Sequence, residues 1–164
     1  MTDRPRDPAG RPLNARPRDE LGRPLPLGAP GVPRVDESLV LAPADALEQA
    51  QRLLDGGRPF HAHEVLEGAW KHAPSAEREL WQGLAQLAVG LTHLLRGNRP
   101  GARTVLLRGR DHVARYVEHP PHDVDAEGLV RWVDDVLAER QPHPPQLRQA
   151  PGERAHRVTA RMGP

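Results

Sequence analysis

The sequence predicts an all-α fold, a small antiparallel bundle of about five helices with extended N- and C-terminal tails. Three observations lead to this prediction. Apolar residues within 35–140 recur at the i, i+3, i+4 spacing of helices, without a competing strand pattern. Proline and glycine stand where these periodic segments end. Most prolines and an excess of arginine lie instead in residues 1–34 and 141–164, so an acidic body separates two basic ends.

Five helices can be placed in order from these signals, over residues 43–56, 59–73, 75–96, 100–119 and 126–140. Pro43 suits the first turn of the first helix. Ser75 and Asp125 are typical N-cap residues for the third and fifth, and Gly97 is typical of the position after a helix. Prolines close the second and fourth helices.

The third helix carries no formal charge from Leu80 to Leu95, so we expect it to be the central, buried helix. The run is too short and too interrupted by Gln and Gly to span a bilayer. Gln82, Gln86 and His93 form a narrow polar stripe on one side of it.

The stretch FHAHEVLEGAW, residues 60–70, places His63 and Glu67 on the same side of the second helix as two aromatic residues. A short connection makes the second and third helices antiparallel neighbours. Counting outward from the turn puts Glu67 opposite Gln82 and His63 opposite Gln86. The fourth helix brings Arg110 near Gln86. We therefore predict a buried polar layer at this level of the bundle.

Three interpretations of this layer remain open. It can be a satisfied polar network that sets the register of the helices. It can line a ligand pocket walled by Phe60, Trp70 and Trp81. It can also be a catalytic or metal site built on His63 with Glu64 or Glu67. HEVLE is similar to the HExxH zinc helix, but Glu67 replaces the second His.

A third metal ligand is missing from this set, because His93 lies about 10 Å along the third helix from Gln86. No cofactor is therefore expected, and His63 and Glu67 are at most weak metal candidates. The histidines at positions 61, 72, 112 and 122 are interpreted as surface residues.

The tails differ from each other. Residues 1–34 contain a duplication, RDPAGRPL at 6–13 and RDELGRPL at 18–25. This arm is either a solvated linker or an extended arm that lies over the acidic body or pairs with a partner, anchored by its leucines. Residues 141–164 show no repetition and are interpreted as disordered.

Composition narrows the function. Cysteine is absent, which excludes disulfides and thiol chemistry. No apolar segment typical of a secretory signal is present, so we expect a cytoplasmic protein without a membrane anchor. The positive charge gathers in the tails, which argues against nucleic acid as the partner. A small molecule or a peptide is the expected ligand, and nothing in the sequence indicates the oligomeric state.

A larger motif surrounds these residues. It consists of an aromatic residue, His-Glu-x-x-Glu and Trp, then Gln-Gly, an apolar helix ending in His, Gly-Asn and Gly-Ala. The motif resembles a bacterial and archaeal family of uncharacterised proteins, domain of unknown function 309. The matching residues are Phe60, His63, Glu64, Glu67, Trp70, Gln82, Gly83, His93, Gly97, Asn98, Gly101 and Ala102.

The resemblance covers about residues 58–117, and the arm resembles the actinobacterial branch of that family. It implies a small helical bundle without an established activity or known cofactor. Two functions follow as hypotheses. The first is a non-enzymatic binding or interaction module that uses a polar and aromatic groove between the second and third helices. The alternative is a small metal-dependent or acid–base hydrolase that uses His63 with Glu64 or Glu67.

Overall fold

The computed structural model describes residues 16–33, 35, 39–138 and 142–150. Its elements are α1 (Pro43–Asp55), α2 (Pro59–His72), α3 (Arg78–Leu95), α4 (Arg99–Ala114), the 3-10 turn η1 (Pro121–Asp123) and α5 (Ala126–Leu137). Within the described ranges the only β-type pairing consists of two isolated bridges. The predicted all-α bundle of about five helices is therefore confirmed.

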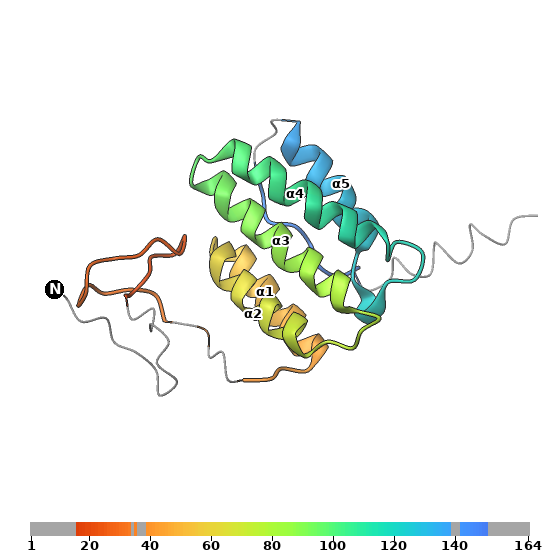
Figure 1. The fold of residues 1–164 in the computed structure, drawn as a ribbon, viewed down its shortest axis with the longest axis horizontal. Coiled ribbons are helices and arrows are strands. Elements are labelled where there is room, and N and C mark those ends of the chain that lie inside the picture. Colours follow the sequence, from red (N-terminus) through yellow and green to blue (C-terminus); the bar gives the residue numbers. More distant parts are fainter. Residues whose placement is uncertain (1–15, 34, 36–38, 139–141, 151–164) are drawn as a thin grey trace, which may run out of the picture.

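The helices are arranged around α3. Figure 1 shows α3 between α2 and α4, with α1 beside α2 and α5 beside α4, and successive helices run in opposite directions. The side chains of α3 are buried on most of its circumference, as its uncharged sequence predicts. No helix in the described part of the chain combines the length and the apolar character that crossing a membrane requires.

Small residues bring α3 and α4 into backbone contact. A Cβ atom on Gly83 would lie 2.9 Å from Cβ of His112 and 3.0 Å from the carbonyl oxygen of Gly109. A Cβ atom on Gly109 would in turn lie 3.0 Å from the carbonyl oxygen of Gly83. Backbone atoms cannot rotate away as side chains do, so these two positions have no room for a larger residue.

The helix ends agree with the sequence in part. The Asp125 side chain accepts a hydrogen bond from Gly128 N at 3.1 Å and caps α5 as predicted. Ser75 does not cap α3, and that prediction is wrong. The chain first makes a turn in which Glu77 N donates to Pro74 O at 2.9 Å, so that α3 begins only at Arg78.

The C-terminal segment also differs from its prediction. Residues 141–164 were expected to be disordered, but the described part of this tail, residues 142–150, is bound to the bundle. Residues 141 and 151–164 lie outside the described residues. Leu147 is buried, its N–H donates to Gln51 of α1, and its carbonyl accepts from Asp125 N. Trp132 of α5 donates to the carbonyl of His143 at 2.8 Å. This segment therefore joins the first and last helices, and the polar partners offered by the two helices explain its order.

The N-terminal arm contacts the bundle through its second repeat. Residues 18–25 lie against the end of the α2–α3 hairpin, where Gly22 meets the ring of Phe60. Of the two interpretations of the arm, the one in which it lies over the body applies to this repeat. The first repeat, residues 6–13, lies outside the described residues.

Candidate functional site

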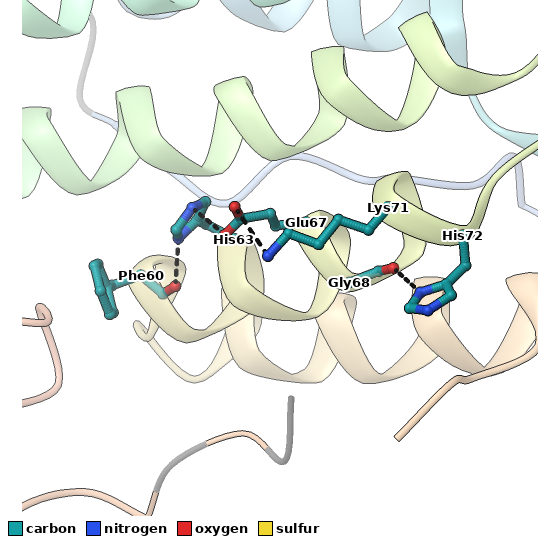
Figure 2. Close-up of polar contacts among 6 residues, drawn as sticks. All are labelled: Phe60, His63, Glu67, Gly68, Lys71 and His72. Carbon is teal, nitrogen blue, oxygen red and sulfur yellow. Dashed lines mark hydrogen bonds and ion pairs between the residues drawn. The ribbon is translucent and has the colours of Figure 1, made fainter. Parts of the chain in front are cut away.

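The predicted polar residues of α2 form a row along one side of the helix. Glu67 lies between two basic side chains, with Oε2 at 3.4 Å from His63 Nε2 and Oε1 at 3.5 Å from Lys71 Nζ. Figure 2 shows the three side chains following one another along α2. His63 Nδ1 also lies 3.2 Å from Phe60 O. Because a carbonyl only accepts, Nδ1 carries the proton in that contact.

The His63–Glu67 pair is only partly shielded from solvent. The exposed fractions of the two side chains are 22% and 36%. Burial lowers the pKa of His63 below its usual 6.5, and this effect outweighs the Glu67 carboxylate, which raises it. An exposed helical pair of this kind contributes only about 0.3–0.5 kcal/mol to stability. The pair therefore adds little to the stability of the fold, and stability alone does not explain its presence.

The predicted four-residue layer does not form as expected. Gln86 Oε1 lies 2.9 Å from Nδ1 of His112, a residue of α4, and so does not complete a network with His63. Arg110 pairs with Asp134 of α5, at 3.2 Å between Nε and Oδ1. The close approach of α3 and α4 at their glycines turns this part of the polar stripe toward α4 and away from α2.

The remaining predicted site residues are dispersed. His93 Nδ1 accepts from the Asn98 amide at 3.1 Å, near the end of α3. Gln82 is half-buried on α3, and Trp70 is half-buried against the core. Glu64 lies with the residues of a cavity on the α1 side of α2. Only His63 and Glu67 are brought together as predicted.

Three of the four histidines interpreted as surface residues are not. His61 is 1% exposed, and its Nδ1 has no hydrogen-bond partner among the described residues. His112 is half-buried against Gln86, and His122 bonds to Glu77 with Nε2 at 2.7 Å from Oε2. The partners of His112 and His122 are distant in sequence, which explains why these two were misinterpreted. His72 is exposed, as expected.

Two adjoining cavities lie beside α2. The first has a volume of about 280 Å³, and the second about 230 Å³. The first lies between α1, α2 and residues Pro33, Val35, Leu39 and Leu41, with Gln49, Arg58 and Glu64 as its polar groups. The second lies between the end of α2 and the start of α3, with Trp81 as its aromatic wall and His72 and Glu77 as polar groups. Both share Leu41, Gly68 and Ala69.

Gly68 stands at the junction of the two cavities. A Cβ atom at this position would meet no atom within 4 Å, so open space lies in front of it. Gly68 was not among the site residues predicted from the sequence. A signal for it is present, because an isolated glycine inside a helical pattern lowers helix stability and calls for an explanation.

Glu77, on the wall of the second cavity, is held from two sides. Its Oε2 accepts from Trp81 Nε1 at 3.2 Å and contacts His122 Nε2 at 2.7 Å. His122 and Asp123 both have a positive φ, 55° and 61°, a conformation that non-glycine residues adopt rarely. No local sequence signal predicts this contact, because His122 follows Glu77 by 45 residues.

A metal-ligand set is not assembled in the part of the chain that the structure describes. No three side chains of His, Asp or Glu come together there in a way that could hold an ion. His63 and Glu67 are two such groups, and Lys71 occupies the other side of the Glu67 carboxylate.

Part of the chain is similar to known sequences. A stretch of 48 residues is 44% identical to the uncharacterized protein YpuF of Bacillus subtilis (strain 168), and it covers 29% of this chain and 28% of that protein. No solved structure matches the chain significantly. The family model of a domain of unknown function, DUF309, matches residues 47–105, the stretch that carries both the His63–Glu67 pair and Gly68.

Proposed function

We propose that the bundle is a non-enzymatic binding module that holds an apolar small molecule, or an apolar side chain of a peptide, in the cavities beside α2. One observation carries this proposal, the open space in front of Gly68. The cavity walled by Trp81 lies where α2 ends and α3 begins, and in the proposal it replaces the groove predicted along the second and third helices. Its polar groups are His72 and Glu77 instead of His63 and Gln82.

Gly68 has no structural reason to be a glycine. It lies inside α2, where glycine costs about 0.5–1 kcal/mol of stability relative to alanine. It has no positive φ, and no neighbour would clash with a side chain. The helix therefore carries a destabilising residue whose one evident effect is to leave open the space that both cavities border.

The walls of the cavities suit a ligand with an apolar body. Leucine, valine, alanine and tryptophan side chains supply most of the surface, and a few charged groups lie among them. Arg58 and Glu64 offer opposite charges in the first cavity. This combination of apolar walls with a few polar groups is typical of small-molecule and peptide sites.

A thermal-shift screen with the full chain tests the proposal. Apolar metabolites and short apolar peptides are screened against the wild type, Gly68→Leu, and the control Ala114→Leu, which introduces the same side chain on an exposed face of α4. We expect compounds that raise the melting temperature of the wild type and the control but not of Gly68→Leu. Compounds that act equally on all three proteins, or a screen without any active compound, would contradict the proposal.

The hydrolase alternative makes a different prediction. A metal enzyme built on His63 would purify with stoichiometric metal that His63→Ala loses. We expect no such metal in the wild type, because no three His, Asp or Glu side chains come together around an ion position in the described part of the chain. Metal analysis of both purified proteins separates the two functions.

A further inference from the structure

The second repeat of the arm folds into a compact turn. Gly22 N donates to Asp19 O at 2.9 Å and closes a four-residue turn. The Asp19 side chain stabilises this turn, since its Oδ1 accepts from Leu21 N at 2.9 Å and from Arg23 N at 2.8 Å. Leu25 N donates to Pro17 O at 2.7 Å and brings the two ends of the repeat together.

This turn packs on the end of the α2–α3 hairpin. Gly22 has a φ of 72°, and a Cβ atom there would lie 2.1 Å from Cγ of Phe60, so both conformation and space require glycine. Arg18 lies over the Phe60 ring at 5.1 Å and donates from Nη1 to Gly22 O at 2.6 Å. Arg96, just after α3, donates from Nε to Leu21 O at 3.0 Å.

Recognition of the turn thus depends on few side chains of the arm. Arg18 stacks on Phe60, Asp19 stabilises the turn, and Gly22 allows close contact with the ring. Arg96 recognises only a backbone carbonyl, which every residue has. Any segment with the pattern Arg-Asp-x-x-Gly meets these requirements.

Residues 6–13 have this pattern. Arg6, Asp7 and Gly10 correspond to Arg18, Asp19 and Gly22, and the identity extends back to Pro5, the counterpart of Pro17. Pro8 replaces Glu20 at the second position of the turn, where proline is favoured. Ala9 replaces Leu21, whose contact with Arg96 is made by its carbonyl.

We propose that the surface formed by Phe60 and Arg96 is a recognition site for an Arg-Asp-x-x-Gly turn, and that residues 6–13 exchange with residues 18–25 on this site within one chain. Either state leaves one copy of the turn undocked. The tether to α1 is 12 residues longer for the first copy, which lowers its effective concentration by only about twofold. The loss of the Leu21 side chain also favours the second copy.

The single phenylalanine of the sequence provides a direct readout. With 4-fluorophenylalanine incorporated at position 60, one ¹⁹F NMR signal reports whether a turn covers the ring. The variants are Gly10→Val, Gly22→Val and the double substitution, all in the full chain, and circular dichroism verifies that each keeps its helices.

We expect the Gly10→Val signal to match the wild type. Gly22→Val should keep most of its intensity at or near that position because the first copy docks, and only the double variant should move fully to a new position. If Gly22→Val alone behaves as the double variant, residues 6–13 do not bind. If the double variant does not move, glycine is not required and the recognition rule is wrong. A docked fraction of Gly22→Val that falls on tenfold dilution would show exchange between chains and overturn the single-chain form.

Discussion

The α3–α4 interface and the outer face of α2 use glycine in opposite ways. Between α3 and α4, Gly83 and Gly109 each lack room for a side chain because the backbone of the other helix is in contact. On α2, Gly68 faces open space between two cavities. The same residue type therefore marks close backbone packing in one region and open space in the other, and only the neighbours in space distinguish the two cases.

The largest effect should come from adding a side chain at the closed interface. Gly109→Val should lower the free energy of unfolding by about 3 kcal/mol, at the upper end for overpacked sites, because the obstacles include the backbone oxygen of Gly83. Urea denaturation measures the change. Gly68→Val is the matched control, and we expect it to change stability by less than about 1 kcal/mol. Equal losses in the two variants would remove the contrast between the two regions.

Lowering the pH should have the next largest effect on stability, and it should act through His61 of α2. The pKa of His61 is lowered from 6.5 by burial and by Arg58, with a smaller contribution from Arg18, while Asp19 and the backbone of Glu20 raise it. The folded state therefore binds the proton less tightly than the unfolded state does. The stability from neutral His61 is present above pH 6.5 and is lost as the pH falls below it.

Thermal unfolding measured between pH 7.5 and pH 5 tests this effect. The melting temperature of the wild type should fall over this interval. His61→Gln should reduce the dependence on pH, whereas the control His72→Gln, on an exposed part of α2, should retain it. Identical pH profiles for His61→Gln and the wild type would show that another group is responsible.

A smaller effect, of opposite sign, should follow from Gly68→Ala. The alanine removes the helix cost of glycine and meets no neighbour, so stability should rise by about 0.5–1 kcal/mol. For a chain of this size the melting temperature should increase by about 2–4 °C per kcal/mol. Scanning calorimetry is sufficient. A decrease would mean that the space in front of Gly68 is filled in solution.

The smallest effect should be that of Glu67→Gln. The His63–Glu67 contact is long and partly exposed, so the substitution should change stability by no more than about 0.5 kcal/mol. Calorimetry on the same instrument allows direct comparison with Gly68→Ala. A loss of more than about 1.5 kcal/mol would support the register-setting interpretation of this pair and weaken its role as part of a site.

The helices could be predicted from the sequence because their signals are local. The i, i+3, i+4 pattern, the Asp125 cap and the prolines between helices depend on neighbouring residues. The His63–Glu67 contact was predictable for the same reason, since it joins residues one turn apart.

The rest of the site depends on partners that are distant in sequence. His112 meets Gln86 across 26 residues, and His122 meets Glu77 across 45. Periodicity gives the face of a helix on which a residue lies, but it does not say which neighbouring helix covers that face. Here the close contact of α3 with α4 at Gly83 makes Gln86 face α4. The segment around Leu147 has the composition of a disordered tail. Its hydrogen bond to Gln51 of α1 could not be predicted either, because no local sequence signal indicates it.

That segment has a consequence for how the protein is made. Leu147 fills a place in the core and bonds to Gln51, 96 residues earlier in the chain. During translation the five helices emerge first, and the place that Leu147 fills in the core stays empty until this residue has left the ribosome. The core is therefore completed only after α5 has been synthesised, and a chain that stops after α5 exposes apolar surface to its neighbours in the cell.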